Sequence, residues 1–297
     1  MTVGRFAPSP SGRMHLGNVF TALLAWLSVR SRNGTMLLRI EDLDPQRSRR
    51  EYIEALRDDL TWLGLDWDRE MPLQSERTEI YERYFEKLPT YPCFCARNEL
   101  HAASAPHASD GRIIYPGTCR ALSEEERRKQ AKKPSWRAAV EDETISFVDG
   151  VCGSVSQSLK DEWGDFIVRR SDGVYAYQLA VVCDDALGGV TQVVRGRDLL
   201  TATAPQIWLY RKLGFSVPSF YHVPLLVAPD GRRLSKRERD LDMEHLRAER
   251  TAQEVVGKLA FLAGLTQEAA PCRPCDLVSV FSWDKISDKD LVIGNDF

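Results

Sequence analysis

Along residues 1–91, short apolar runs alternate with longer segments in which apolar residues recur at helical spacing. The runs at 2–6 and 35–40 predict two strands. The segment between them predicts a helix, and its apolar positions are Val19, Leu23, Trp26 and Leu27. Asn33 and Gly34 supply a left-handed turn that ends this helix. Together these elements make a βαβ unit, whose parallel strands place ligands at their carboxyl ends.

Two more helices are predicted before residue 91. Ser48 and Glu51 have the spacing of a capping box, so we expect a helix to begin there. Gly64 supplies its end, because glycine adopts the left-handed conformation that commonly follows a helix. The next helix is expected to begin near Ser75.

The alternation stops at Tyr91. Residues 101–111 are rich in alanine, serine, histidine and proline, and strand-like pieces follow near 136–140 and 145–148. Strands and helices alternate again after residue 160, so we interpret 92–160 as an insertion between two halves of one sheet.

Beyond the insertion, we interpret the valines of 175–185 and 189–198 as those of two core strands. A helix over 203–212, a strand over 221–227 and helical periodicity from Leu241 follow. The predicted fold class is therefore α/β, with a Rossmann-type parallel sheet and a small helical C-terminal region. Its predicted units are 1–91 (first half of the sheet domain), 92–160 (insertion), 161–228 (second half) and 229–297 (helical region).

Composition narrows the class of protein. The 297 residues are 43% hydrophobic and 28% charged, which is ordinary for a globular protein. No apolar run approaches the eighteen residues of a membrane span, and the N-terminus lacks the layout of a signal peptide. A cytoplasmic monomer with no membrane partner is expected. The net charge of −3 argues against a protein that binds nucleic acid through overall basicity, so such a site would need a local basic face.

The turn between the first strand and the first helix carries the clearest candidate chemistry. Pro8 and Pro10 break the strand, and Gly12 and Gly17 allow a ligand close to the backbone. A helix N-terminus attracts phosphate through its free N–H groups and its dipole. With His15 beside it, the turn is predicted to bind phosphate.

The string from Pro8 to Asn18 resembles the "HIGH" signature of class I aminoacyl-tRNA synthetases, in the form of the glutamyl and glutaminyl branch. A glycine turn with cationic residues at 231–237 resembles the "KMSKS" signature of the same enzymes, with Arg233 to Arg237 as its core. Arg233 stands where that pattern has its first lysine. The resemblance implies that His15, Gly17, Asn18 and Lys236 bind ATP, and that His15 and Lys236 stabilise charge on the displaced phosphates.

The resemblance also implies a glutamate pocket, formed by Arg5, Phe6, Ala7, Pro8, Ser9, Glu41, Tyr177 and Arg195. This assignment makes chemical sense because Arg5 and Arg195 are cations for two carboxylates, whereas Glu41 is an anion for an ammonium group. Arg195 ends an apolar strand, and a guanidinium at such a place is expected to bind a carboxylate or a phosphate.

Of the seven cysteines, Cys93, Cys95 and Cys119 lie together in the first part of the insertion, and they suggest one zinc ion per chain. From the residues alone, His101 and His107 are the candidates for a fourth ligand, whereas the resemblance implies Tyr115. A competing interpretation uses Cys272 and Cys275, as partners of the first pair or as a redox pair, but surface thiols are favoured there. Cys152 and Cys183 are expected to be small buried apolar residues.

Only 61 residues follow Lys236, so we expect no anticodon-binding domain. With the insertion pattern, this makes the chain similar to the synthetase-like family that glutamylates queuosine in the anticodon of tRNA(Asp). That family would activate L-glutamate with ATP and Mg²⁺ without tRNA, and then transfer it to queuosine. The alternatives are a truncated glutamyl-tRNA synthetase that charges a tRNA 3′ end and a catalytically silent module that binds RNA or zinc. The basic candidates for tRNA contact are Arg232, Arg237, Arg239, Arg247 and Arg250.

Overall fold

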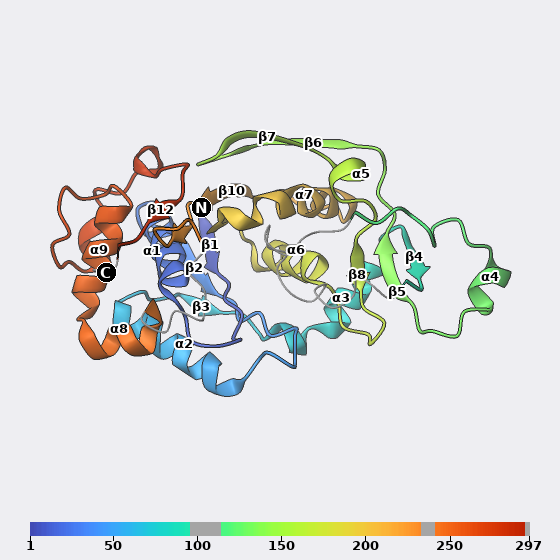
Figure 1. Cartoon of the computed structure of the whole chain (residues 1–297), viewed down its shortest axis with the longest axis horizontal. Coiled ribbons are helices and arrows are strands. Elements are labelled where there is room, and N and C mark those ends of the chain that lie inside the picture. Colours follow the sequence, from blue (N-terminus) through green and yellow to red (C-terminus); the bar gives the residue numbers. More distant parts are fainter. Residues whose placement is uncertain (96–113, 233–240, 295–297) are drawn as a thin grey trace.

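The computed structural model describes residues 1–95, 114–232 and 241–294 (Figure 1). Its first sheet has the order β1 (Val3–Phe6), β2 (Thr35–Leu38), β3 (Arg69–Glu70), and all its pairs are parallel. A second sheet has the order β7 (Gly153–Ser158), β6 (Thr144–Asp149), β10 (Ser219–Val223), β9 (Gln192–Gly196). The two sheets adjoin where Thr191, just before β9, donates its N–H to the Val3 carbonyl at 2.9 Å. The predicted Rossmann-type arrangement is present, since β3, β2 and β1 are parallel neighbours, β9 and β10 are parallel neighbours, and the two sets adjoin between β1 and β9.

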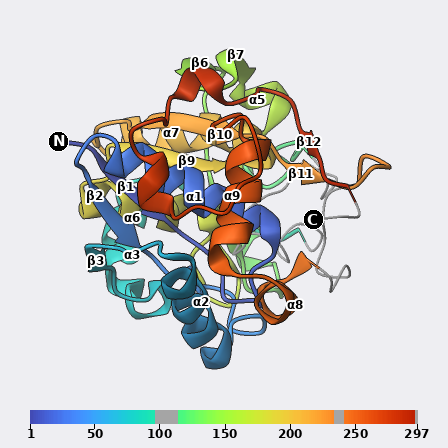
Figure 2. The same ribbon diagram turned by 90° about the vertical axis from the view of Figure 1, so that its left-hand side faces the viewer.

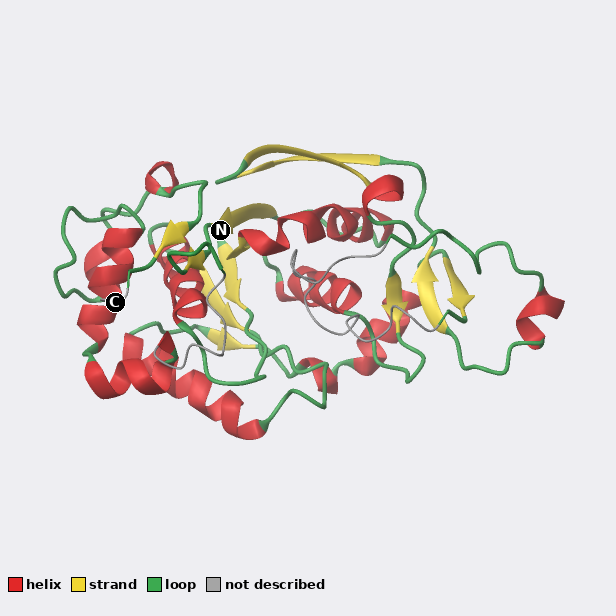
Figure 3. Cartoon of the chain, in the orientation of Figure 1, coloured by secondary structure: helices red, strands yellow, loops and turns green. Residues whose placement is uncertain are grey.

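The remaining strands of the described residues form two smaller sheets. β4 (Thr90–Cys93), β5 (Ser135–Ala138) and β8 (Ile167–Arg169) pair antiparallel, and they lie at the right-hand end of the molecule in Figure 3. β11 (Leu226–Val227) pairs with β12 (Leu291–Val292). The predicted boundaries of the insertion stay a prediction, and two pairings cross them: β5 with β8, and β6 with β10.

The α-helices of the described residues are α1 (Leu16–Arg30), α2 (Arg50–Leu63), α3 (Thr78–Phe85), α4 (Glu124–Arg128), α5 (Leu159–Glu162), α6 (Tyr177–Gly188), α7 (Thr203–Lys212), α8 (Met243–Glu249) and α9 (Ala252–Leu262). Helices α1, α2 and α9 share one hydrophobic core, whereas α6 and α7 fill a second one. In Figure 2 the C-terminal helices α8 and α9 lie on the side of the molecule that carries α1 and α2. None of the helices within the described ranges has the length and apolarity needed to cross a membrane.

Two sequence predictions about these elements are wrong. Helix α2 begins at Arg50 with Arg49 as its N-cap, and no side chain caps it. Ser48 is instead in a turn, where its N–H donates to the Asp44 carbonyl at 2.9 Å. Residues 177–188 form helix α6 rather than a strand. Nine of its residues are buried, so the helix has no polar stripe to reveal its period.

Other predictions about the turns are confirmed. Asn33 has φ 49°, and Gly64 has φ 76° at the end of α2. Most predicted ends of strands and helices also agree with the structure to within about two residues. This holds for the strands predicted at 2–6, 35–40, 136–140 and 145–148, and for the helices predicted at 203–212 and beyond Leu241.

Candidate functional site

The turn between β1 and α1 is held by its own side chains. His15 is the N-cap of α1, and its Nδ1 accepts a hydrogen bond from the Gly17 N–H at 3.1 Å. The Asn18 Oδ1 accepts in turn from the His15 N–H at 3.2 Å. Because Nδ1 acts as an acceptor, the proton of the neutral ring lies on Nε2. The helix start thus brings the positive end of the helix dipole together with an imidazole, which suits a phosphate.

The second signature, Arg233 to Arg237 with Lys236, lies outside the described residues, and its role stays a prediction. The residues that flank it are described. The Met243 N–H donates to the Met14 carbonyl at 2.9 Å, and Asp242 forms a β-bridge with His15. The chain therefore returns to the first signature immediately after the second one.

Behind the turn lies a buried cluster of charges. Arg5, on β1, donates from Nε to Asp185 Oδ1 at 3.2 Å and from Nη1 to the Val194 carbonyl at 3.0 Å. Arg39, at the end of β2, donates to the same Asp185 oxygen and also to Glu41 Oε1 at 3.0 Å. Neither Arg39 nor Asp185 was expected from the sequence to belong to the site.

Burial and the neighbouring charges shift the titration of these groups. Burial raises the pKa of Glu41, although Arg39 and Arg5 oppose that effect. Burial alone would also raise the pKa of Asp185, but the guanidinium groups of Arg39 and Arg5 hold it below its ordinary value. Asp185 is therefore a permanent negative charge that fixes two cations.

Arg195, on β9, is held by uncharged side chains. Its Nε donates to His222 Nε2 at 3.0 Å, Nη1 donates to Gln206 Oε1 at 2.8 Å, and Nη2 donates to Thr203 Oγ1 at 2.9 Å. Its side chain is only 4% exposed. Burial lowers the pKa of Arg195, and the charge of Arg5 acts in the same direction. Among the residues that the structure describes, no carboxylate forms an ion pair with this guanidinium.

The remaining glutamate-pocket candidates lie around these cations. Phe6 and Pro8 place their carbonyls against the backbone after β2, accepting from the N–H groups of Arg39 at 3.0 Å and Glu41 at 2.9 Å. Ala7 and Ser9 lie in the same turn. Tyr177 is the first residue of α6; burial raises its pKa, and the nearby charges of Arg195 and Glu41 act on it. The structure thus brings together the described residues that the family pattern assigns to glutamate.

Two further buried polar atoms lie near Arg195. Gln206 Nε2 donates to Gln178 Oε1 at 2.8 Å, which leaves Gln178 Nε2 unpaired within the described part of the chain. Tyr210 Oη is also buried and unpaired there, and burial raises its pKa well above the ordinary value, with the charge of Asp185 acting in the same direction. Unpaired buried donors are expensive in a folded protein unless a ligand satisfies them.

The cysteine cluster is a candidate metal centre. The sulfur atoms of Cys93, Cys95 and Cys119 all lie within 4.8 Å of one another, and those of Cys95 and Cys119 are 3.7 Å apart. Two sulfur ligands about 2.3 Å from a tetrahedral zinc lie about 3.8 Å apart. The Tyr115 Oη lies 3.5 Å from Cys93 Sγ, at a place suited to a fourth ligand. The donor set therefore fits zinc.

The alternative ligands do not join this cluster. Cys272 lies beside α9, where its N–H donates to the Gln253 carbonyl at 3.1 Å, and Cys275 is exposed. Figure 1 shows α9 and β4 at opposite ends of the molecule, so the proposed partnership of Cys272 with the first pair is wrong. His101 and His107 lie outside the described residues. Cys183 is buried as predicted, and Cys152 is half-buried.

The basic candidates for tRNA contact have varied surroundings. Arg247 donates to Asp59 at 2.8 Å and to Asp58 at 3.2 Å, and its guanidinium lies over the Trp62 ring. It therefore packs α8 onto α2. Arg232 pairs with Asp230. Arg237 and Arg239 lie outside the described residues, whereas Arg250 directly follows α8.

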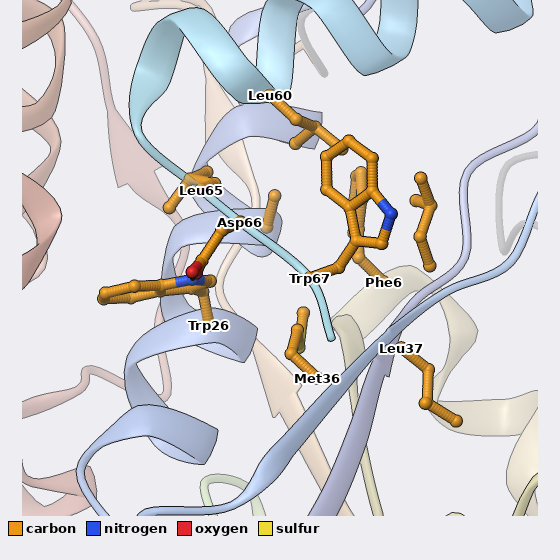
Figure 4. Close-up of a pocket in the computed structure, with 10 residues that line it drawn as sticks. Phe6, Trp26, Met36, Leu37, Leu60, Leu65, Asp66 and Trp67 are labelled. Atoms are coloured by element: carbon orange, nitrogen blue, oxygen red, sulfur yellow. The ribbon is translucent and has the colours of Figure 1, made fainter. Parts of the chain in front are cut away.

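A small apolar pocket between α1, α2 and β2 is drawn in Figure 4. Trp26, Met36, Leu60 and Trp67 line it, as does Phe6 of the glutamate-pocket candidates, whereas His15 does not. Its lining belongs largely to the core that α1 shares with α2. We attribute it to imperfect packing of large side chains rather than to ligand binding.

Comparisons with known proteins agree with this geometry. The family model of class I tRNA synthetases (E and Q), catalytic domain, matches residues 1–283. A glutamyl-Q tRNA(Asp) synthetase from Symbiobacterium thermophilum is 50% identical and aligns over 96% of this chain and 94% of its own length. The protein of that name from Nitratidesulfovibrio vulgaris is 45% identical, and the alignment covers 100% of this chain and 97% of that protein.

Longer proteins match over part of their length. A glutamate–tRNA ligase from Sulfurihydrogenibium is 41% identical, and the alignment covers 88% of this chain but 58% of the ligase. The crystal structure of a glutamate tRNA ligase from Elizabethkingia meningosepticum, in complex with its amino acid, superimposes with a TM-score of 0.83 and 27% identity. That match covers 99% of this chain and 67% of the ligase.

Proposed function

Because this chain belongs to the class I tRNA synthetases of the E and Q group, and to the glutamyl-Q tRNA(Asp) synthetases within it, we propose that it activates L-glutamate with ATP and transfers the glutamyl group to queuosine in tRNA(Asp). It is a ligase-type enzyme. Two relatives of that name align over nearly their whole length and nearly all of this chain, which favours this substrate over the 3′ end of a tRNA.

The observation that carries the glutamate assignment is the environment of Arg195. Its three hydrogen-bond acceptors are uncharged, and it lies in the same buried layer as Arg5 and Tyr177. A buried cation without a counter-charge is unfavourable, so an anionic ligand stabilises it. We assign one carboxylate of glutamate to Arg195. Arg5 is the cation for the other carboxylate and Glu41 the anion for the ammonium group, and Phe6 to Ser9 with Tyr177 line the pocket.

The proposed chemistry has two steps. A carboxylate oxygen of glutamate bonds to the α-phosphorus of ATP, the bond from that phosphorus to the α,β-bridging oxygen breaks, and pyrophosphate leaves. A hydroxyl oxygen of the queuosine cyclopentene ring then bonds to the glutamyl carbonyl carbon, AMP leaves with the electron pair of the broken C–O bond, and the hydroxyl proton passes to solvent.

The chain's own residues contribute mainly position and charge. The N-terminus of α1, with Gly17, Asn18 and an Nε2 proton on His15, faces the phosphates in this proposal. Lys236 is assigned to the same phosphates. Mg²⁺ accompanies ATP and offsets its charge.

We further propose that Cys93, Cys95, Cys119 and Tyr115 hold one zinc ion. Its chemistry would be structural, because four protein ligands leave no open position for substrate. It would join β4 to the segment that carries Tyr115 and Cys119.

The test is pyrophosphate exchange with each of the twenty amino acids in the absence of tRNA. Glutamate alone should support exchange. Transfer is then measured with tRNA(Asp) that contains or lacks queuosine, and only the modified tRNA should accept glutamate. Equal transfer to both tRNAs, or exchange with another amino acid, would contradict the proposal.

One substitution tests the pocket directly. Arg195→Ala should reduce glutamate-dependent exchange by at least about a hundredfold, because a lost charge-assisted contact of a buried group is worth on the order of 3 kcal/mol. ATP binding should persist. Arg128→Ala, on the exposed helix α4, is the matched control and should leave exchange unchanged. Normal exchange by Arg195→Ala would refute the assignment.

A further inference from the structure

His222 lies directly opposite Arg195 in the parallel pairing of β10 with β9. It is fully buried, and its Nδ1 lies 2.6 Å from Asp149 Oδ2. The other carboxylate oxygen of Asp149 accepts three backbone N–H groups: those of His222 at 3.1 Å, Val151 at 3.0 Å and Cys152 at 2.9 Å. The family pattern does not include His222 or Asp149 in the site.

The chemistry of the partners fixes the direction of every hydrogen bond in this group. An ionised carboxylate only accepts, so Nδ1 of His222 must carry a proton and donate to Asp149. Nε2 is then the acceptor of the neutral ring, and it faces the Nε–H of Arg195, which can only donate. The Thr203 hydroxyl accepts from Arg195 Nη2 at 2.9 Å and can donate its own proton to His222 Nε2 at 3.2 Å.

Each alternative state of His222 breaks the contact with Arg195. A doubly protonated ring, or a ring with its only proton on Nε2, would place a donor against the Arg195 Nε–H. Burial lowers the pKa of His222 to about 4, and the charge of Arg195 also lowers it, so the ring is neutral near pH 7. The nearby carboxylate then selects which nitrogen keeps the proton.

We propose that His222 is a positioning residue for glutamate binding, and that Asp149 acts through it by fixing the tautomer that accepts from Arg195. The inference rests on the proposed function, in which Arg195 holds a substrate carboxylate. His222, Thr203 and Gln206 together use one N–H on each nitrogen of the guanidinium, and this fixes its plane and rotation. One N–H on each of Nη1 and Nη2 remains for a ligand within the described part of the site.

The main variant is Asp149→Asn, which changes the shape of the side chain very little. If the amide oxygen keeps the backbone N–H bonds of Val151 and Cys152, the amide nitrogen faces His222 Nδ1 as a donor. The ring should then move its proton to Nε2 and oppose Arg195. We expect the KM for glutamate in pyrophosphate exchange to rise about tenfold or more, with a much smaller change in kcat and in the KM for ATP.

A second pair of variants separates positioning from packing. His222→Gln can place an amide oxygen near the former Nε2 position, so it should retain much of the affinity for glutamate. His222→Leu fills similar space without an acceptor and should raise the KM like Asp149→Asn. Asp165→Asn removes another buried carboxylate, near β5 and β8, and controls for the general effect of losing such a group. It should leave the KM for glutamate unchanged.

Nitrogen NMR of ¹⁵N-labelled histidine reports the tautomer without any assay of activity. The His222→Gln spectrum identifies the His222 signals. We expect the Nδ1–H tautomer in the unmodified protein and the Nε2–H tautomer in Asp149→Asn. An Nε2–H tautomer in the unmodified protein would overturn the inference, even if the protein proved not to use glutamate.

The kinetic outcomes are equally decisive. Failure of glutamate to support exchange by the unmodified protein would refute the proposed function. The NMR result would still test whether Asp149 fixes the tautomer of His222 that accepts from Arg195. Glutamate-dependent exchange with an unchanged KM in Asp149→Asn and in His222→Leu would refute the inference alone. If Asp149→Asn fails to fold, the contrast between His222→Gln and His222→Leu decides the question.

Discussion

Replacing Asp185 by asparagine tests whether the charge cluster behind the glutamate pocket is a structural requirement. Asp185 is 1% exposed and accepts from both Arg5 and Arg39, two buried cations. Asparagine keeps the volume but removes the charge. Breaking one partner of a buried ion pair typically destabilises a protein by about 3–5 kcal/mol, because the other charge stays buried. Glu41 pairs directly with Arg39 at 3.0 Å and acts on Arg5 only through space, so it compensates the loss in part.

We therefore expect Asp185→Asn to lose about 3–5 kcal/mol of unfolding free energy, against a typical total of about 5–15 kcal/mol. Urea denaturation followed by tryptophan fluorescence measures this loss. The matched control is Glu124→Gln, whose side chain is 82% exposed and pairs with Arg128 one helical turn away. Such surface pairs contribute below about 0.5 kcal/mol.

The effect should also depend on pH with a definite sign. Arg39 and Arg5 hold the pKa of Asp185 in the folded state below its ordinary value. Its contribution is therefore complete above the pKa of the unfolded state, about 3.9, and disappears as the pH falls through the lower folded value. The difference between the unmodified protein and Asp185→Asn should shrink only in strong acid. A difference below about 1 kcal/mol at pH 7 would refute the reasoning.

Three other predictions follow from separate parts of the structure. Cys119→Ser should reduce zinc from one ion per chain, measured by elemental analysis, whereas exposed Cys275→Ser should not; equal zinc in both would contradict the site. Gly257→Ala should lose about 1–3 kcal/mol by urea denaturation, because a Cβ there would lie 2.1 Å from the Ala270 carbonyl oxygen; unchanged stability would show that the backbone moves freely. Thr251→Ala should lose about 1 kcal/mol of unfolding free energy in the same assay, because the Thr251 hydroxyl caps α9. Thr251→Ser keeps a hydroxyl and should retain most of that stability. Equal losses in the two variants would contradict a capping role.

The signature turn was predictable because its determinants are local. His15, Gly17 and Asn18 lie within one helical turn, and the side chains of His15 and Asn18 cap that turn through bonds to the backbone of Gly17 and His15. Helix α6 was not predictable in the same way. Periodicity appears only when one face of a helix is polar, and α6 is buried on nearly every side between β8, α3 and α7. Its valines therefore looked like those of core strands.

The missed site residues depend on contacts between distant parts of the chain. Asp184 and Asp185 are adjacent, yet Asp184 binds Arg77, Gln74 and Tyr81, whereas Asp185 binds the cations of the pocket. Consecutive helical residues point about 100° apart, so neighbouring carboxylates serve different layers. Contacts with Arg5, 180 residues earlier, and with Arg39 distinguish the role of Asp185 from that of Asp184.

The contrast between Arg5 and Arg195 explains how a buried pocket can be both stable and ready for an anion. Arg5 has a permanent carboxylate partner, so its charge is balanced before substrate arrives. Arg195 is oriented by neutral acceptors, which supply hydrogen bonds without cancelling its charge. A carboxylate of the protein paired with Arg195 would have stabilised the substrate-free protein, and it would have competed with the carboxylate of the substrate. Neutral acceptors hold the geometry and leave the electrostatic gain for the ligand, which is the arrangement expected when binding strength must come from an incoming carboxylate.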